Sequence, residues 1–155
     1  MKNIIDEFKS AKCFIYNCNA GYLDPNHWTQ DIEIGGGRLL GEACHFVDLL
    51  RFLAGAPIMH ISKIEIENKN ITSDSFSISI KFEDGSIGTI NYFSNGHRSF
   101  PKENLKVFVG GKIIELDNYR KLKTWGIQGF KNIRKLTQDK GHKNCIKEFF
   151  KAIKN

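Results

Sequence analysis

Apolar residues recur with helical spacing between Gly37 and Gly55. At about 100° per residue, one broad face collects the apolar side chains Leu39, Leu40, Ala43, Phe46, Val47, Leu50, Leu53 and Ala54. Three glycines at residues 35–37 interrupt the chain before this segment, and Pro57 prevents the helix from restarting after Gly55. The pattern predicts one helix with a single buried side.

After Pro57 the pattern changes from a helical period to an alternating one. Apolar and polar residues alternate most cleanly in Phe76–Phe82, which is typical of a strand with one buried face. Asp84-Gly85 then suits a tight hairpin turn, because these residue types tolerate positive φ angles. Gly110-Gly111 suits a second turn. The expected strands are Met59–Glu67, Phe76–Phe82, Ile87–Phe93, Leu105–Val109 and Lys112–Leu116.

The two ends of the chain add further elements. Lys2–Ser10 has the spacing of a short amphipathic helix, and the aromatic and β-branched run after it predicts a strand over Lys12–Asn19. Lys143–Ile153 predicts a terminal helix, whereas Thr124–Thr137 fits a strand, a loop or a helix equally well. The terminal helix is expected to turn inward the side chains Cys145, Ile146, Phe149, Phe150 and Ile153.

These elements together predict an α+β fold in a single domain, 1–155. We expect an open, mostly antiparallel β-sheet with helices packed on one face. The other face of the sheet is left free, and an exposed face with apolar patches favours contact with a second copy in a dimer or larger homo-oligomer.

Composition is ordinary for a soluble globular protein of 155 residues, with 41% hydrophobic and 26% charged residues. No apolar run approaches the length of a membrane span, and the charged N-terminus has no signal peptide, so we expect a cytoplasmic protein without a membrane partner. The four cysteines form no C-x-x-C pair, which gives little support to a zinc site. We expect reduced, mostly buried thiols and no metal ion.

The net charge of +6 is concentrated near the C-terminus. Residues 119–155 hold 11 Lys and Arg against 2 Asp and Glu, whereas residues 1–118 hold 12 against 15. Such a segment attracts phosphate groups, nucleic acid or an acidic partner protein, or is simply a solvated face. Its single Trp provides no stacking platform for bases, which disfavours nucleic acid.

Four polar residues follow the flank of the predicted helix at spacings of four, three and three: Arg38, Glu42, His45 and Asp48. Two carboxylates and an imidazole in consecutive turns are the composition of a site that moves protons. A histidine beside an apolar face is also common as a purely structural residue. The spacing alone therefore leaves a catalytic and a structural interpretation open.

Two irregular segments contribute candidate binding groups. The first, residues 19–31, leads directly into the glycines, so its polar groups could meet the helix flank. Its candidate residues are Asn19, Asp24, His27, Trp28 and Asp31. The indole of Trp28 either stacks against a ligand ring or fills the core. The second segment, residues 94–103, suits an anionic ligand or simple surface exposure through His97, Arg98 and Lys102.

The order of these segments resembles the C-terminal domain of the glucose–fructose oxidoreductase / inositol dehydrogenase / rhizopine catabolism (Gfo/Idh/MocA) family. The resemblance rests mainly on Gly35–Asp48, in which a glycine cluster is followed by a His-x-x-Asp helix. The run Gly-Glu-Ala-Cys-His at 41–45 is similar to a subgroup attached to sugar and surface-polysaccharide metabolism. The other matching segments are His27–Asp31, Pro101–Glu103, Leu116–Arg120 and Asp139–His142.

The resemblance implies an NAD(P)-dependent oxidoreductase of sugars, nucleotide sugars or polyols. In that family an N-terminal Rossmann domain binds the nucleotide, and the C-terminal domain supplies the substrate pocket, a catalytic histidine and an oligomerisation face. His45 matches that histidine, and Asp48 matches the acidic residue one turn further on. The family's aspartate four residues before the histidine corresponds to Gly41, so Glu42 is the candidate replacement. The expected substrate-binding residues are Asn19, His27, Trp28 and Arg38.

The sequence contains no Rossmann fingerprint, because no strand is followed by G-x-G-x-x-G and a helix, and no Glu-Lys-Pro occurs. We therefore expect the substrate-binding and oligomerisation domain of a dehydrogenase whose nucleotide-binding domain is missing or supplied by another chain. NAD or NADP would act in the complete enzyme, and none would bind this chain alone, which would be inactive. The alternatives are a degenerate structural dimerisation domain and a basic anion- or nucleic-acid-binding module.

Overall fold

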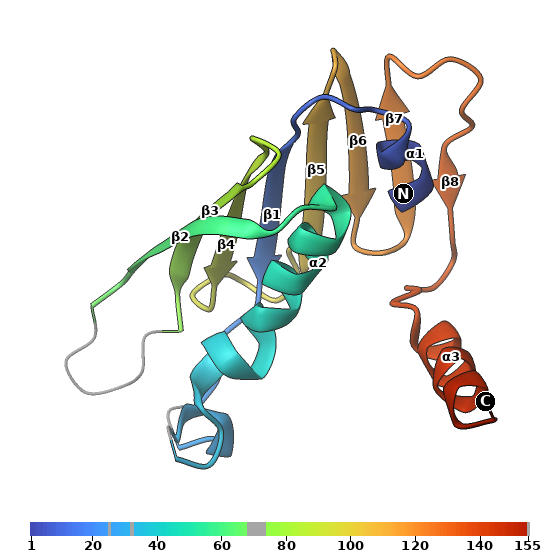
Figure 1. Ribbon diagram of the computed structural model, residues 1–155. Coiled ribbons are helices and arrows are strands. Elements are labelled where there is room, and N and C mark those ends of the chain that lie inside the picture. Colours follow the sequence, from blue (N-terminus) through green and yellow to red (C-terminus); the bar gives the residue numbers. More distant parts are fainter. Residues whose placement is uncertain (25, 32, 68–73, 155) are drawn as a thin grey trace.

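A computed structural model describes residues 1–24, 26–31, 33–67 and 74–154 (Figure 1). Pro25, in the predicted loop 19–31, lies outside the described residues. In chain order the elements are α1 (Lys2–Asp6), β1 (Cys13–Asn19), the 3₁₀-helix η1 (Trp28–Gln30), the π-helix η2 (Leu39–Ala43), α2 (Cys44–Ala54), β2 (Ile58–Glu65), β3 (Phe76–Phe82), β4 (Ile87–Phe93), β5 (Glu103–Val109), β6 (Lys112–Asp117), β7 (Lys121–Trp125), β8 (Ile133–Arg134) and α3 (His142–Lys154).

The strands form one open sheet in the order β2-β3-β4-β1-β5-β6-β7-β8, which confirms the predicted α+β class. Alternation along β3 is as expected, since its apolar residues are buried on the face that carries α2. The β3–β4 hairpin also forms at Asp84-Gly85. Gly85 adopts a φ of 84°, and the Asp84 carboxylate accepts hydrogen bonds from the backbone N–H and the hydroxyl of Ser86 at 3.0 and 2.9 Å.

The first strand lies in the middle of the sheet rather than at its edge. β1 pairs parallel with β4 and antiparallel with β5, so Tyr16 stands between Ile90 and Leu105. This placement makes the sheet mixed and brings residues 74 to 95 positions apart into contact. It also places Cys18 directly beside Glu103.

The hydrophobic core lies between α2 and the sheet. Phe46 stacks on Tyr16 with ring centroids 4.4 Å apart, and Tyr92 stacks on Phe76 at 5.0 Å. Leu50 is fully buried above Gly88, where an added Cβ would lie 3.0 Å from the leucine Cδ1. Glycine therefore lets the helix approach the sheet closely at this point, and burial of side chains of this size supplies most of the packing energy, at about 1.5–3 kcal/mol each.

The glycine cluster shapes the start of the central helix. Gly36 and Gly37 have φ angles of 66° and 72°, and a Cβ on Gly35 would meet the carbonyl oxygen of Trp28 at 2.5 Å. The helix then begins with the π-turn η2, in which the Cys44 N–H bonds the Leu39 carbonyl. The wider turn departs from the spacing that the sequence pattern assumed.

Several local predictions need correction. Leu40 was expected on the buried face, but its side chain is 68% exposed, because the π-turn rotates it away from the sheet. The N-terminal helix ends at Asp6 instead of Ser10. All four cysteines are free, as expected, but only Cys18 is buried.

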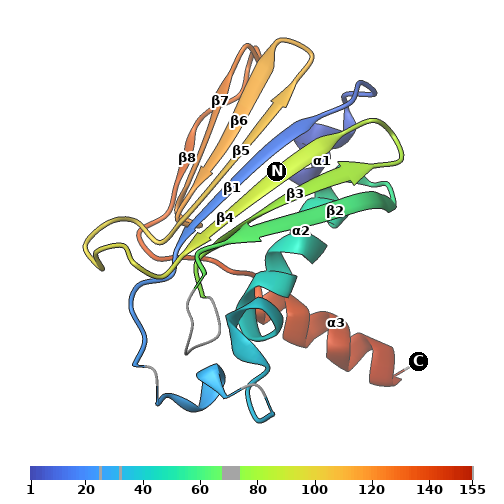
Figure 2. The same ribbon diagram turned by 90° about the vertical axis from the view of Figure 1, so that its left-hand side faces the viewer.

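The terminal helix α3 forms close to its predicted bounds, but its apolar side chains are exposed instead of turned inward. Figure 2 shows α3 on the same side of the sheet as α2, beyond the end of the strands. The unassigned region before it contains the end of β7 and the short strand β8. Among the described residues, no helix combines the length and apolar character needed to cross a bilayer.

Candidate active site

The polar stripe predicted on the central helix is divided between two environments. Arg38 and Glu42, at the π-turn, point toward the sheet, and Arg38 is only 9% exposed. His45 and Asp48, in the regular α-helix, are exposed. A π-turn advances fewer degrees per residue than an α-turn, so residues before and after it no longer share one flank.

Glu42 is the centre of a hydrogen-bonded network beneath the helix start. Its Oε1 accepts a bond of 2.6 Å from the Lys102 ammonium, and its Oε2 accepts one of 2.5 Å from the Tyr92 hydroxyl. Tyr92 Oη in turn accepts a bond of 2.5 Å from Arg38 Nε, and the Arg38 guanidinium lies 3.6 Å from Glu42. Each carboxylate oxygen therefore accepts a hydrogen bond, and the Glu42 side chain joins the start of the central helix to β4 and to the loop before β5.

The electrostatics of this network favour the charged forms of Glu42 and Lys102. Burial by itself would raise the pKa of Glu42, but the hydrogen bonds from Lys102 and Tyr92 and the nearby cations lower it below the ordinary value. Burial would lower the pKa of Lys102, yet the bond to Glu42 and its charge raise it. Burial, followed by the Glu42 interaction, raises the pKa of Tyr92, so its hydroxyl stays a donor.

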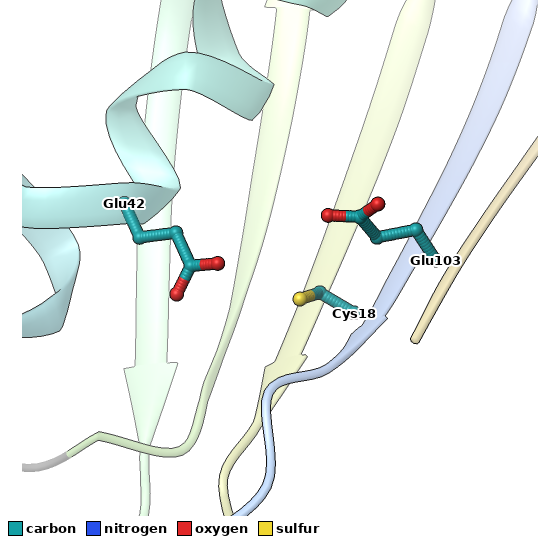
Figure 3. Close-up of side chains that lie close together, drawn as sticks. All are labelled: Cys18, Glu42 and Glu103. Carbon is teal, nitrogen blue, oxygen red and sulfur yellow. The ribbon is translucent and has the colours of Figure 1, made fainter. Parts of the chain in front are cut away.

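A second set of polar groups lies beside the first. Cys18, Glu42 and Glu103 bring their ligand atoms within 4.8 Å of one another, and Figure 3 shows the three side chains converging. Glu103 is 4% exposed and lies 3.0 Å from the Lys140 ammonium, which also lies over the Tyr119 ring. Tyr119 Oη is 3.5 Å from Tyr16 Oη.

This cluster is the part of the site whose residues could hold a metal ion. Thiolate and carboxylate groups are ordinary metal ligands. However, burial, with a contribution from the Glu42 charge, raises the pKa of Cys18 to about 12, which keeps it a neutral thiol. Lys102 and Lys140 already neutralise the two carboxylates. The arrangement is that of a charge-balanced buried network.

Sequence reasoning missed most of this network. Lys102, Glu103, Tyr119 and Lys140 come from three of the segments that carried the family resemblance, but no role was assigned to Glu103, Tyr119 or Lys140. Glu103 falls in alternation with the apolar residues Leu105, Val107 and Val109 of β5, and a carboxylate at such a position is the one local signal of a buried ion pair.

His45 and Asp48 have a different setting. Within the described residues, neither side chain makes a hydrogen bond or ion pair, and Glu42 does not contact His45 within ion-pair distance. Asp48 borders an open groove of about 480 Å³ between α2 and β2, together with Val47 and Ile61. The imidazole is thus available to a group that approaches α2 from outside the sheet.

Within the described residues, none of the other expected substrate-binding residues forms a hydrogen bond, ion pair or ring contact with His45. Asn19 donates through Nδ2 to the carbonyl oxygens of His97 and Phe100 at 2.9 and 3.3 Å, and so holds the loop before β5. His27 is bonded to Thr29 at 2.9 Å, and Trp28 is 61% exposed. Of the four, only Arg38 is brought to Glu42.

A second hollow, of about 710 Å³, opens on the sheet face that does not carry α2. Asn17, Asn19, Phe93, Phe100 and Lys106 are among its lining residues, and His45 is not. The hollow and the exposed imidazole of His45 therefore lie on opposite faces of the sheet.

The family model described as "Oxidoreductase family, C-terminal alpha/beta domain" matches residues 2–135. The chain belongs to this family. No curated protein matches it. Among solved structures, a similar fold is found in UDP-N-acetylglucosamine 3-dehydrogenase GnnA from Acidithiobacillus ferrooxidans. The two chains are 15% identical, with a TM-score of 0.70, and the match covers 98% of this chain and 49% of that one.

Two further solved structures share the fold of this oxidoreductase-family chain. Levoglucosan dehydrogenase in complex with NADH and levoglucosan has 20% identity and a TM-score of 0.72, over 98% of this chain and 52% of that one. A dehydrogenase from Clostridium difficile has 16% identity and a TM-score of 0.73, over 99% and 50%. The chain therefore spans about half the length of each of these structures.

Proposed function

We propose that this chain is the substrate-binding and oligomerisation half of an NAD(P)-dependent oxidoreductase that acts on a CH–OH group of a sugar, nucleotide sugar or polyol. The observation that carries the proposal is the exposed, uncommitted imidazole of His45 on a family-matched helix. The structural neighbours support it, because they include a UDP-N-acetylglucosamine 3-dehydrogenase and a levoglucosan dehydrogenase in complex with NADH and levoglucosan.

His45 is the proposed proton carrier. Imidazole is the side chain that most readily gives and takes a proton near neutral pH, and hydroxyl oxidation must release a proton from the oxygen. Asp48, one turn further along α2, is placed to orient a charged imidazole when substrate excludes water. Each carboxylate oxygen of Glu42 already accepts a hydrogen bond, from Tyr92 or from Lys102, so we assign Glu42 the role of holding the start of the helix on the sheet.

Within the described residues, no segment has the form of a Rossmann dinucleotide site. Such a site has a glycine turn between a buried strand and a helix N-terminus. Here the glycines follow a loop, and Gly35 is packed against the Trp28 backbone. NAD or NADP would supply the hydride chemistry from the other half of the enzyme, while this half would bind the substrate and move the proton.

The test is reconstitution. The coding region upstream of Met1 is sequenced, any in-frame or neighbouring nucleotide-binding segment is co-expressed with this chain, and NADH formation is followed on a panel of sugars and nucleotide sugars. We expect turnover only with both halves present, and a loss of about 10²–10⁴-fold for His45→Ala. Turnover by the isolated chain, or full activity of His45→Ala, would refute the assignment.

Oligomerisation is proposed for the sheet face that does not carry α2. The pairing register aligns Ile87, Cys13, Phe108, Ile113 and Trp125 in one apolar row across five strands. Ile87 and Trp125 are 52% and 48% exposed. Light scattering should show a dimer or larger assembly for the native chain and a monomer for Ile87→Arg. The matched control, Asn26→Arg in an exposed loop, should leave the assembly intact.

A further inference from the structure

The hollow of about 710 Å³ on the sheet face without α2, called the outer hollow below, has no part in the catalytic proposal. Its size falls within the range of about 300–1,000 Å³ that is usual for small-molecule sites. Polar side chains of the central strands line its floor, and the loop 94–102 between β4 and β5 forms one wall. Figure 2 shows this loop extending from the sheet on the side away from α2.

The floor belongs to a hydrogen-bonded row of polar residues that crosses neighbouring strands. Ser77 on β3 donates through Oγ to Asn91 Oδ1, and Asn91 donates through Nδ2 to Asn17 Oδ1, both at 2.8 Å. These bonds leave the amide nitrogen of Asn17 as a donor. Asn104, the β5 partner of Asn17, donates through Nδ2 to Glu115 at 3.1 Å, which leaves its amide oxygen as an acceptor. Within the described residues, neither remaining atom is given a partner.

A donor and an acceptor side by side on the floor suit a ligand with two neighbouring hydroxyl groups. Each hydroxyl both donates and accepts, so one can bind the Asn17 nitrogen and the next the Asn104 oxygen. Two exposed rings also line the hollow, Phe93 at 43% and Phe100 at 69% exposure. Such rings offer apolar area to the C–H side of a sugar ring. The lining therefore fits a polyhydroxylated ring.

The charged groups at the outer hollow already have partners of opposite sign. The Lys102 ammonium is bonded to Glu42 at 2.6 Å. The Lys106 ammonium lies 3.8 Å from Glu115, and the Asp117 carboxylate lies 3.4 Å from a lysine ammonium. An anion that approached either lysine would meet the repulsion of the carboxylate beside it. Recognition therefore falls to the amides and rings, which favours a neutral ligand.

The loop wall is held in place without a ligand. The two bonds from the Asn19 amide to the carbonyls of His97 and Phe100 fix its middle, and the Asn19 backbone N–H donates to the Lys102 carbonyl at 2.7 Å. Gly96 packs so closely that an added Cβ would lie 2.0 Å from Asn19 Oδ1. A wall that is already ordered lowers the entropic cost of binding.

The outer hollow is separate from the apolar row proposed for oligomerisation. On β1 the apolar row crosses at Cys13, whereas the polar row crosses at Asn17. At about 3.3 Å per residue, the two rows are about 13 Å apart along the strand. One end of this sheet face can therefore contact a second copy while the other end stays open to a small molecule.

We propose that the outer hollow binds a neutral pyranose or cyclic polyol, with Asn17 and Asn104 bonded to two neighbouring hydroxyls and Phe93 and Phe100 against the ring. His45 lies on the opposite face of the sheet, so this ligand is not the one that reacts. The proposal does not depend on catalysis. A free sugar and the end of a saccharide chain share this chemistry, and the test distinguishes them.

The test records the side-chain amide NMR signals of the full 155-residue chain during titration with glucose, N-acetylglucosamine and myo-inositol. We expect saturable shifts of the Asn17 and Asn104 NH₂ signals. Asn17→Val removes the free donor and Phe100→Ala removes a ring, so each should weaken binding about 5–10-fold. The backbone amide spectrum verifies that each variant is folded.

Matched controls change exposed side chains outside the hollow. Asn26→Ala and Phe52→Ala should leave the affinity unchanged, and so should His45→Ala. Ile87→Arg should also bind equally, because the polar row is separate from the apolar one. Cellotriose is titrated in parallel with glucose. Tighter binding of the trisaccharide identifies the end of a saccharide chain as the ligand, and equal binding identifies a single ring.

The absence of saturable shifts with all of these sugars, or equal affinity of Asn17→Val and the native chain, would overturn the proposal. So would tighter binding of glucose 6-phosphate than of glucose, which indicates an anion site. Shifts that follow protein concentration without sugar, or binding lost in Ile87→Arg, would also overturn it, because a second copy would then fill or form the hollow. The readout needs no turnover, so failure of the catalytic role of His45 is distinguishable from failure of this site.

Discussion

Two neighbouring turns of the same helix place similar residues in opposite settings. At the π-turn, Arg38 and Glu42 are drawn into a network under the helix and are fully engaged. One turn later, His45 and Asp48 face outward without partners in the described part of the chain. The difference shows that polar residues at regular helical spacing need not share one role. The first pair fixes the helix on the sheet, and the second is free to meet a ligand.

The largest expected effect comes from removing Glu42. Glu42→Ala deletes the acceptor of Lys102 and Tyr92 and leaves the 9%-exposed Arg38 without its carboxylate. We expect a loss of about 2–4 kcal/mol in the free energy of unfolding, since an uncompensated buried charge is costly. Urea unfolding measures it, and a change under 0.5 kcal/mol would contradict the role given to the network.

The pH dependence of stability tests the same residue in another way. The pKa of Glu42 is lowered in the folded chain. Its ionised carboxylate therefore stabilises the fold above pH 4.5, the ordinary pKa, and this stabilisation is lost as the pH falls through the folded pKa. The raised pKa of Lys102 means that its charge also stabilises the fold below pH 10.5, and this stabilisation is lost as the pH rises through the folded value. Glu42→Gln should therefore differ most from the native chain near neutral pH and converge with it in acid.

A smaller effect is expected at Tyr92. Tyr92→Phe keeps the ring stacked on Phe76 but removes the hydroxyl between Arg38 and Glu42. We expect a loss of about 1.5–3 kcal/mol in unfolding free energy, the usual range for hydrogen bonds to charged groups. A double-mutant cycle with Glu42→Gln should show coupling between the two sites, and strict additivity would place Tyr92 outside the network.

The smallest effect on stability is expected at the exposed pair. His45→Ala and Asp48→Asn should change the free energy of unfolding by no more than about 0.5 kcal/mol, because neither side chain is buried or bonded. Thermal melts of the isolated chain measure this. A destabilisation as large as that of Glu42→Ala would mean that the two parts of the helix are not functionally separate.

The sequence predicted the locally determined parts of the fold well. The two hairpins follow from Asp84-Gly85 and Gly110-Gly111, and the end of the central helix follows from Gly55, whose φ is 75°. Insertion of β1 between β4 and β5 could not be predicted, because it depends on pairing between distant segments. The exposure of Leu40 was missed because a period of 3.6 residues does not anticipate a π-turn.

The site was predictable only in its sequence-local part. The spacing from Arg38 to Asp48 identified four polar residues on one helix, and their catalytic and binding roles stay predictions. The contact of Glu42 with Lys102 and Tyr92 depends on how three strands pair, which no local pattern contains. The proximity of Glu103, Cys18 and Lys140 has the same origin.

The central place of β1 has a consequence for biosynthesis. Cys13–Asn19 leaves the ribosome early, but its partners in β4 and β5 begin at residues 87 and 103. The strand must stay unpaired until β4 and β5 have been made, and contacts of such large sequence separation fold slowly, on a scale of about milliseconds to seconds. Nascent chains that stall before β5 leave the central strand β1 as an exposed, unpaired edge, so premature termination should yield aggregation instead of a smaller folded unit.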